Sequence, residues 1–321
     1  MKLGILGTGM IVQDVLPVFY DLQPESISIL GTERSVELTE SLKETYSMDR
    51  TYYDYDALLE SDVDTVYVAL PNHLHFSYAK KALEHGKHVL VEKPATTCLR
   101  DFLELRRLAE DKKLVLIECM NLHHLPAYRD LKQNLPAIGQ IRMVSLNYSQ
   151  YSSRYDAFLA GELPPAFDVK RSGGALMDIN YYNIHFAAGL FGKPEQVHYS
   201  ANLQRGVDTS GVLLLVYPGF QVVCIGAKDC RSSTLSSIQG EKGSFYVPTP
   251  ANQMTAYTLA LGKAVPETKS FPGGHRLAPE MQECMRIVDE KDLTACAALM
   301  DASEQALGII DEARRQLGLT V

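Results

Sequence analysis

The sequence lacks several features that would point to particular classes of protein. It has six cysteines in 321 residues, and none of them forms a Cys-x-x-Cys pair. Several lie in apolar runs, so we interpret most of the six as small buried side chains. This pattern argues against a structural zinc site and favours a reducing compartment. We expect no metal site of any kind, because no cluster of histidine, cysteine and aspartate has the spacing of metal ligands.

Basic runs and long apolar runs are also missing. Lys and Arg total 31 against 39 Asp and Glu, a formal net charge of −8. An acidic chain without a basic run is a poor candidate for binding nucleic acid or an anionic membrane surface. The most apolar run, Val212 to Ala227, is interrupted by Pro218, Gly219 and Gln221, so it is not a membrane span. Since we also see no positively charged leader, we expect a cytoplasmic protein.

The sequence does have the composition of a full-sized globular protein. Hydrophobic residues make up 46% and charged residues 22%, which is typical of folded cores and not of disorder. At roughly 150 residues a domain, the length suggests two domains. We place the boundary near residue 120, where the pattern of the sequence changes, and so expect domains over residues 1–120 and 121–321.

The first 120 residues alternate short apolar runs with helical patterns. Such alternation, with strands that are apolar almost throughout, predicts a parallel sheet covered by helices on both faces. We expect strands at 2–7, 26–30, 65–70, 87–92 and 114–119, and helices that begin near residues 10, 36, 71 and 99.

Residues 121–321 have a different pattern, with longer strand-like runs bounded by glycine and proline. We expect strands at 140–151, 197–204, 211–217 and 221–227, and helices at 177–191 and 302–317. Partial alternation along these strands predicts a large, mostly antiparallel open sheet with a face that needs cover. The second of these helices is a candidate to pack back on the first domain.

The first expected strand ends in a glycine-rich turn, "GTGMIV". Gly7 allows a tight turn, and Gly9 lets the backbone approach a pyrophosphate at the start of the following helix. The third glycine of the usual G-x-G-x-x-G pattern is Val12, which implies looser helix–strand packing without lost phosphate binding. The alternative is a glycine-rich turn without a ligand. We therefore expect a Rossmann domain that binds a dinucleotide through Gly7, Thr8, Gly9, Met10 and Ile11.

The end of the second expected strand bears on the choice of nucleotide. The acid that usually binds the adenosine ribose would stand close to Thr32, which is neutral. Arg34 suits a 2′-phosphate, so Thr32 and Arg34 favour NADP over NAD. Glu33 argues the other way, because it could bind the ribose itself or repel the phosphate. The alternative is an ordinary solvated loop.

Polar residues also follow the next two strands of the expected sheet. Asn72 is a suitable N-cap for its helix, which would place His75 in the first turn. Glu92, Lys93 and Pro94 end the following strand at the same edge, where ligands bind in open α/β folds. A single histidine can instead be a packing residue, and a charged pair can simply begin a solvated loop. We expect the cofactor to be lined by Leu70, Pro71, Asn72, His75, Glu92 and Lys93.

Three segments together resemble a known family. They are "LGILGTGMI", "VYVALPNHLHFSYAKKALEHGKHVLVEKP" and "GGALMDINYYNIHFAAGLFGKP". They resemble the glucose-fructose oxidoreductase, inositol 2-dehydrogenase and MocA family (Gfo/Idh/MocA), and the resemblance covers essentially the whole chain. It implies a Rossmann domain followed by an α/β domain with an open sheet. It also implies NAD(P)-dependent hydride transfer to or from a carbinol or carbonyl of a sugar, polyol or related cyclic alcohol, in a homodimer or homotetramer.

The resemblance also assigns catalytic roles. Lys93 matches the family lysine at the nicotinamide, and Asp178 matches the aspartate near the substrate. The family pattern D-x-G-x-H would place a histidine where this chain has Tyr182, a tyrosine that resembles the branch of the dihydrodiol dehydrogenases. A lysine beside a tyrosine favours tyrosinate, so Lys93 and Tyr182 can handle the carbinol proton while Asp178 orients the substrate.

Several positions depart from the family pattern. Asn180 replaces the family glycine, and Asn121 and His123 stand where that branch has an aromatic residue and an arginine. His185, three residues after Tyr182, is either a packed histidine or a second candidate proton carrier. We expect Asn121, His123, Asn180 and His185 to form a rebuilt substrate wall. Two other functions stay open: a catalytically weak NAD(P)-binding sensor, and the reduction of an unsaturated ring or imine.

Overall fold

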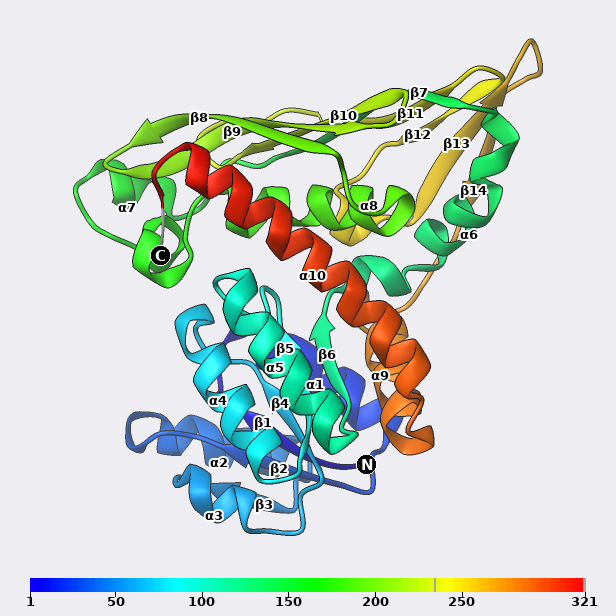
Figure 1. Ribbon diagram of the computed structural model, residues 1–321. Helices are drawn as coiled ribbons and strands as arrows, with labels where there is room; N and C mark the ends of the chain where they lie inside the picture. Colours follow the sequence, from blue (N-terminus) through cyan, green and yellow to red (C-terminus); the bar gives the residue numbers. More distant parts are fainter. Residues whose placement is uncertain (234, 320–321) are drawn as a thin grey trace. The chain divides into compact units, whose positions relative to one another are not determined.

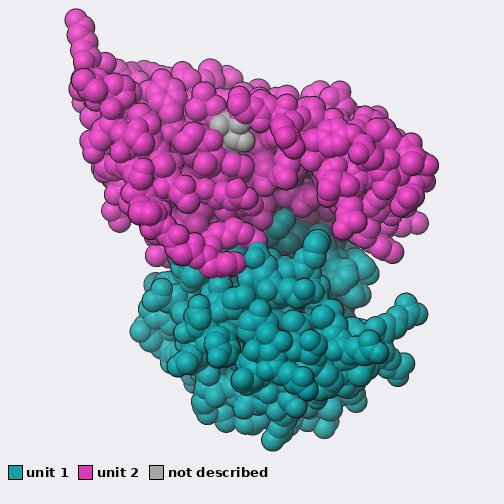
Figure 2. Space-filling view, turned by 180° about the vertical axis from the view of Figure 1, so that it is seen from behind, with its two compact units in different colours: residues 1–120, 277–303 teal, residues 121–276, 304–321 magenta. Residues whose placement is uncertain are grey.

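The computed structural model describes residues 1–233 and 235–319, which form two compact units (Figures 1 and 2). Unit 1 consists of residues 1–120 and 277–303, and unit 2 consists of residues 121–276 and the chain from Glu304 onward. The second unit is therefore not the continuous stretch 121–321 that the sequence suggested. Hydrophobic periodicity shows that a segment forms a helix, but it does not show which core the helix completes.

Unit 1 is built on a parallel sheet of six strands in the order β3-β2-β1-β4-β5-β6. The central strands are almost entirely buried, which explains why valine, isoleucine and leucine fill them without alternation. The expected doubly wound parallel sheet is confirmed. The strands are β1 (Lys2–Leu6), β2 (Ser26–Leu30), β3 (Arg50–Tyr52), β4 (Thr65–Val68), β5 (His88–Glu92) and β6 (Leu116–Cys119).

The helices of unit 1 pack on this sheet through narrow apolar stripes. In α5, Phe102, Leu105 and Ala109 are buried while most other side chains are charged. Helix α4 packs beside α5, and α1 contacts α9. Helix α9 belongs to residues 277–303, the returning segment that joins unit 1 after the chain has formed most of unit 2. The helices are α1 (Met10–Leu22), α2 (Val36–Thr45), α3 (Tyr55–Leu59), α4 (Asn72–Glu84), α5 (Leu99–Lys112) and α9 (Ala278–Glu290), with a short 3₁₀ turn at Glu33–Ser35.

Unit 2 contains a sheet of eight strands in the order β14-β13-β12-β11-β7-β10-β9-β8. Its one parallel pair is β7 with β10, and the other neighbours are antiparallel, so the expected mostly antiparallel sheet is confirmed. The strands are β7 (Ile141–Ser149), β8 (Gln196–Gln204), β9 (Val207–Tyr217), β10 (Phe220–Ala227), β11 (Ser236–Gly240), β12 (Gly243–Val247), β13 (Ala256–Leu261) and β14 (Glu267–Ser270).

One face of this sheet is covered by helix α8, as Figure 1 shows. In β9, Leu213 and Leu215 are fully buried, whereas Val212 on the opposite face is 45% exposed. Helix α8 begins with a π-helical turn that positions candidate site residues. The helices are α6 (Pro126–Asn134), α7 (Tyr155–Leu159), the π-helical turn (Leu176–Asn180) and α8 (Tyr181–Phe191), while α10 (Leu293–Gln316) is shared by both units.

Short 3₁₀ turns complete unit 2 at Asn121–His124, Leu135–Ile138, Pro165–Phe167, Val169–Arg171 and Ala251–Gln253. Among the described residues, the structure contains no helix with both the length and the apolar character to cross a membrane.

Candidate active site

The glycine-rich turn joins β1 to α1 as the sequence predicted. Gly7 has φ +105°, and a Cβ there would lie 2.8 Å from the Ala69 carbonyl oxygen, so both backbone conformation and space require glycine. Gly9 is the N-cap of α1, has extended backbone angles, and would carry a Cβ with no neighbour within 4 Å. The space above Gly9 is thus open, at a helix N-terminus that favours a phosphate. These residues fit a dinucleotide pyrophosphate.

Thr8, Met10 and Ile11 complete this turn at the surface. Met10 is 78% exposed, and the Thr8 carbonyl accepts a hydrogen bond of 3.0 Å from the Gln13 side-chain amide. Because Gln13 belongs to α1, this hydrogen bond ties the turn to the helix that follows it.

The loop after β2 is held by its own side chains. Thr32 is the N-cap of the 3₁₀ turn, and its backbone N–H donates to the Ser35 hydroxyl at 2.9 Å. Arg34 is exposed and makes no ion pair with any residue that the structure describes. Its guanidinium is therefore available to a phosphate. Glu33 is exposed as well. Both predictions therefore stay open: Arg34 could bind the 2′-phosphate of NADP, and Glu33 could bind the ribose of NAD.

The start of α4 corrects one detail of the sequence analysis. Asn72 is not the N-cap but the first helical residue, and Pro71 is the N-cap. The Pro71 carbonyl accepts the Leu74 N–H at 2.8 Å, which closes the first turn of the helix. Proline reaches this position because its fixed φ suits the entry to a helix and its missing N–H is not needed there. Asn72 remains partly exposed.

His75 is fully buried and connects two loops. Its Nε2 lies 2.7 Å from the Leu70 carbonyl oxygen, and its Nδ1 lies 2.8 Å from the Pro94 carbonyl oxygen. The ring therefore joins the segment after β4 to the segment after β5. Burial lowers the pKa of His75, while the two carbonyl contacts act in the opposite direction. Because both nitrogens contact backbone, His75 positions the loops around the expected cofactor.

Glu92, the last residue of β5, also faces inward. The Tyr67 hydroxyl donates to Glu92 Oε1 at 2.5 Å, and the Lys93 N–H donates to Oε2 at 3.2 Å. Burial, followed by the charge of Glu92, raises the pKa of the Tyr67 phenol well above its usual range, so the phenol stays a proton donor. The carboxylate thus shapes the end of the strand, and Lys93, which is partly exposed, follows it.

The peptide bond between Lys93 and Pro94 is cis. Glu118 on β6, which is buried, accepts the next backbone N–H, that of Ala95, at 2.7 Å. Buried side chains of Glu92, His75 and Glu118 therefore hold three consecutive parts of this segment. Tyr67 and Glu118 were not among the predicted site residues, although a carboxylate inside the apolar run "LVLIEC" is a signal that the sequence contains.

In unit 2, Asp178 and Tyr182 are the partly exposed residues of an otherwise buried segment. Every other residue from 172 to 188 is buried. Asp178 lies in the π-helical turn, and Tyr182 follows four residues later in the first turn of α8. Residues at that spacing share one face of a helix. The Tyr182 ring lies 6.0 Å from the ring of Tyr148, centroid to centroid. The structure thus presents these two predicted catalytic side chains together.

Asn180 has a different environment from its neighbours. Its side chain is 1% exposed, its Nδ2 donates to the Cys224 carbonyl at 3.2 Å, and its Oδ1 accepts from Asn183 at 2.8 Å. Asn183 in turn donates to the Ile225 carbonyl. These bonds attach the π-helical turn to β10. Asn180 is therefore placed to support the turn, and contact with a substrate remains a prediction.

His185 and His123 form a hydrogen-bonded pair, with 3.0 Å between His185 Nδ1 and His123 Nε2. His185 is fully buried, and its ring packs on Tyr181 with centroids 4.6 Å apart. Burial, and then the neighbouring His185, hold the pKa of His123 well below its usual range. This geometry favours the packing alternative for His185, and its role as a proton carrier stays a prediction.

Asn121 is also buried, and its Nδ2 donates to the Asn252 carbonyl at 2.9 Å. The four residues expected to form a substrate wall are thus placed in three separate packing contacts. Among the described residues, no group of three or more His, Cys, Asp or Glu side chains is arranged to hold a metal ion.

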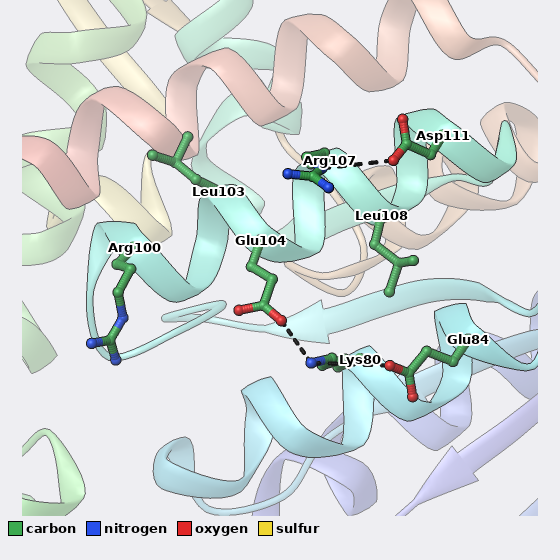
Figure 3. A pocket seen from close by; sticks show the side chains of 8 residues that line it. All are labelled: Lys80, Glu84, Arg100, Leu103, Glu104, Arg107, Leu108 and Asp111. Atoms are coloured by element: carbon green, nitrogen blue, oxygen red, sulfur yellow. Dashed lines mark ion pairs between the residues drawn. The ribbon is translucent and has the colours of Figure 1, made fainter.

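A shallow cavity of about 560 Å³ lies on unit 1 between α4 and α5 (Figure 3). Its lining is mostly charged, and the charges are paired: Lys80 with Glu104 at 2.6 Å and with Glu84 at 4.0 Å, and Arg107 with Asp111 at 3.7 Å. It contains none of the predicted site residues. Exposed ion pairs of this kind are ordinary surface features, so we do not assign it to the site.

Family models match both parts of the chain. A model described as an oxidoreductase family with an NAD-binding Rossmann fold matches residues 1–119. A model of the GFO/IDH/MocA C-terminal domain matches residues 134–246. These matches and the site geometry define an NAD(P)-binding oxidoreductase. The chain belongs to the Gfo/Idh/MocA family, as its sequence motifs predicted.

Similar proteins extend over nearly the whole chain. Scyllo-inositol 2-dehydrogenase (NADP(+)) IolU of Bacillus subtilis is 32% identical over 99% of this chain and 98% of its own length. Trans-1,2-dihydrobenzene-1,2-diol dehydrogenase of Xenopus tropicalis is 25% identical over 99% and 98%. The solved structure of KijD10, a 3-ketoreductase from Actinomadura kijaniata, has a TM-score of 0.81 and 22% identity over 98% and 96%, which supports the fold alone.

The comparisons confirm the predicted class of enzyme. It is an NAD(P)-dependent oxidoreductase that transfers a hydride between the nicotinamide and a carbinol or carbonyl of a sugar, polyol or related cyclic alcohol. The roles of single residues, the oligomeric state and the cytoplasmic location stay predictions.

Proposed function

We propose that this protein is an NADP-preferring dehydrogenase of a cyclic polyol, with Lys93, Tyr182 and Asp178 as its catalytic residues. The observation that carries the proposal is the exposure pattern of residues 172–188. Asp178 and Tyr182 alone in that segment are not buried, and they lie at helical spacing. A buried segment that presents an acid and a phenol on one face is suited to hold a hydroxylated substrate.

The proposed roles follow from the proton inventory of the reaction. A bound nicotinamide supplies the acceptor or donor of the hydride. Oxidation of a carbinol also releases the hydroxyl proton, which Tyr182 takes as tyrosinate. The Lys93 ammonium favours the tyrosinate form. It can release a proton, and the neutral amine that remains can take up the proton that Tyr182 received. Asp178 accepts a hydrogen bond from a substrate hydroxyl and so fixes which carbinol faces the cofactor.

The proposed cofactor and substrate come from two independent sources. Arg34 is an exposed guanidinium at the end of β2, where a 2′-phosphate would lie, and no acid stands at Thr32. The relative that is 32% identical over nearly the full length is named for scyllo-inositol and NADP(+). We therefore choose scyllo-inositol with NADP⁺ as the first substrate pair to test.

The test is a dehydrogenase screen read as NAD(P)H absorbance. It compares scyllo-inositol, myo-inositol, aldopentoses and a trans-dihydrodiol with NADP⁺ and with NAD⁺. The proposal expects turnover of a cyclic polyol, faster with NADP⁺. Turnover of the dihydrodiol alone would change the proposed substrate class from cyclic polyols to diols. Faster turnover with NAD⁺ would make NAD the preferred cofactor instead of NADP.

The sensor alternative loses part of its basis. It rested on Asn180, Asn121 and His123, which depart from the family pattern. The side chains of all three make packing contacts within unit 2. A departure in a packing contact is no sign of lost catalysis. Binding of NADPH without turnover of any substrate in the screen would restore the sensor.

We also propose that the chain forms a homodimer or homotetramer through the open face of the eight-stranded sheet. The register places Val212 beside Ile225, and Leu214 beside Val223, on the face opposite the buried Leu213. Apolar side chains grouped on an open face favour association. Sedimentation at micromolar concentration should find an oligomer, and Val212→Lys should convert it to monomers. A wild-type monomer would contradict the proposal.

A further inference from the structure

A buried lysine lies directly behind the surface carboxylate Asp178. Lys228 is the residue after β10, and its side chain is 1% exposed. Its Nζ donates to Asp178 Oδ2 at 2.7 Å and to the Ala166 carbonyl at 2.6 Å. The ammonium also lies 4.6 Å from the centroid of the Phe167 ring.

The environment of this ammonium is rigid. Phe167 stacks on Phe158 with ring centroids 4.8 Å apart and belongs to a small buried cluster with Tyr155. The backbone of Lys228 is fixed on both sides, because its N–H donates to the Thr209 carbonyl and its carbonyl accepts from Ser152. These contacts fix the position of the ammonium. Through it, they also fix the position of the carboxylate oxygen that the ammonium contacts.

Stability alone is a poor reason for this lysine. Removing an ammonium from water is costly, and apolar residues of similar volume often replace buried ion pairs without loss of stability. The partner of Lys228 is also not a buried acid, since the Asp178 side chain is 41% exposed. The buried charge therefore supports a carboxylate that reaches the surface of unit 2.

The backbone that carries Asp178 is fixed by a second carboxylate. Asp208 Oδ2 accepts the Leu176 N–H at 2.7 Å and the Tyr199 hydroxyl at 2.9 Å. Gly174 has φ +117°, and a Cβ there would lie 2.1 Å from Asp208 Oδ1, so only glycine lets this acid approach. Asp208 thus holds the start of the π-helical turn, while Lys228 holds the side chain that the turn presents.

We propose that Lys228 is the positioning residue of the active site: its buried ammonium holds the Asp178 carboxylate in one orientation toward the substrate hydroxyl. This inference rests on the proposed function, in which Asp178 contacts substrate. Lys228 itself acts through Asp178 and does not touch substrate. No residue of this role was recognised in the sequence, because nothing in "GAKDCRSS" distinguishes a buried lysine from a loop lysine.

The experiment compares Lys228→Met, Asp178→Asn and the double variant, with scyllo-inositol and NADP⁺ as the probe pair. Misplacing a reacting group by about 1 Å costs on the order of 100-fold, so Lys228→Met should lower kcat/KM by roughly tenfold to 100-fold. NADPH binding, followed by fluorescence, should not change. Because Lys228 acts through Asp178, the double variant should be no worse than Asp178→Asn. Lys228→Arg should retain more turnover than Lys228→Met.

The chain offers a matched control. Lys269 on β14 pairs with Asp130 at 3.3 Å and lies 5.9 Å from the centroid of the Tyr257 ring, so it too has an acid and an aromatic partner. Lys269→Met should leave kcat/KM unchanged. Wild-type turnover in Lys228→Met, or independent losses that multiply in the double variant, would overturn the inference.

A second readout does not depend on turnover. In a crystal structure of Lys228→Met, the Asp178 carboxylate should leave its wild-type position or occupy several, and an unmoved carboxylate overturns the inference. If Lys228→Met fails to fold, kcat/KM of the double variant, which removes both charges, is compared with that of Asp178→Asn. A lower value in the double variant overturns the inference. If Asp178→Asn keeps wild-type turnover while Lys93→Met abolishes it, the role of Asp178 in the proposed function fails, and the inference fails with it.

Discussion

The two units use their polar residues in opposite ways. In unit 1, the side chains of Glu92, His75 and Glu118 face inward and hold backbone, and the turn offered to a ligand is the backbone of Gly7 to Met10. In unit 2, backbone is packed and the side chains of Asp178 and Tyr182 are presented. A cofactor shared by many enzymes can be held by backbone, whereas discrimination between polyols requires side chains.

This difference predicts where substitutions act. Changes to the inward-facing side chains of unit 1 should lower stability and cofactor affinity. Changes to Asp178 or Tyr182 should lower turnover and leave cofactor affinity unchanged. Lys93 is the exception in unit 1. It is a partly exposed side chain at a strand end, so its substitution should lower turnover, as at Asp178 and Tyr182.

The largest expected effect tests whether Lys93 and Tyr182 work as one unit. General acid–base groups contribute roughly 100-fold to 10,000-fold in rate. Lys93→Met and Tyr182→Phe should each lower kcat by a factor in that range, measured on a substrate from the screen. The double variant should be little worse than the poorer single variant.

His185 supplies the contrast to this prediction. Because it is fully buried and paired with His123, His185→Ala should lower stability more than it lowers turnover. Near-wild-type turnover in Tyr182→Phe together with loss of turnover in His185→Ala would reverse the assignment and make His185 the proton carrier.

The sequence predicted unit 1 better than unit 2, for physical reasons. Apolar strands, a glycine-rich turn and "EKP" are local signals, and they correctly predicted the parallel sheet and the turn before α1. The returning segment 277–303 joins a unit whose other residues are 1–120, and β11 pairs with β7, a strand far away in the sequence. Strands β12 to β14 pair with sequence neighbours, but they are short and only partly apolar, so their signal is weak. The same holds for the site: Asp178 and Tyr182 had motif support, but Lys228 reaches the Asp178 side chain, and Asp208 the Leu176 backbone, through tertiary contacts only.

The next effect tests the cofactor side of the comparison. Hydrogen bonds to charged groups contribute about 1.5–3 kcal/mol, so Arg34→Ala should weaken NADP⁺ binding at least tenfold and leave NAD⁺ binding unchanged. Titration calorimetry with both nucleotides measures this. Arg107→Ala is the control, because Arg107 is a second exposed arginine of unit 1, 84% exposed. An unchanged NADP⁺/NAD⁺ ratio would exclude Arg34, and a wild-type preference for NAD⁺ would assign the ribose to Glu33.

A smaller effect tests how unit 2 holds its π-helical turn. A Cβ on Gly226 would lie 2.6 Å from Asn180 Cβ and 2.9 Å from its Cγ. Overpacking of this kind costs about 1–3 kcal/mol, so Gly226→Ala should lower the free energy of unfolding by that amount in urea titrations. Adding Asn180→Gly should recover part of the loss, since the two sites are in contact.

Gly274 provides the control for that prediction, because a Cβ there meets nothing within 4 Å. Gly274→Ala should therefore be neutral. Equal stability of Gly226→Ala and wild type would mean that β10 moves away from the turn at no cost.

The smallest effect concerns the buried histidine pair of unit 2. Burial, and after it His185, His124, Lys132 and Arg129, lower the pKa of His123 in the folded protein. In the unfolded chain, His123 has an ordinary pKa of about 6.5. Below that pH the unfolded chain therefore binds a proton at His123 that the folded chain does not bind. The contribution to stability is complete above that pH and is lost as the pH falls below it.

One such histidine changes the free energy of unfolding by at most about 1.4 kcal/mol for each pH unit. Urea unfolding of wild type from about pH 7.5 to about pH 5.5 should therefore show a steeper loss than that of His123→Gln. His198→Gln, at an exposed histidine of β8, should follow the wild-type curve. If His123→Gln loses stability as steeply as wild type, the proton enters the folded pair, and unit 2 then holds a buried charge beside α8, as it already does at Lys228.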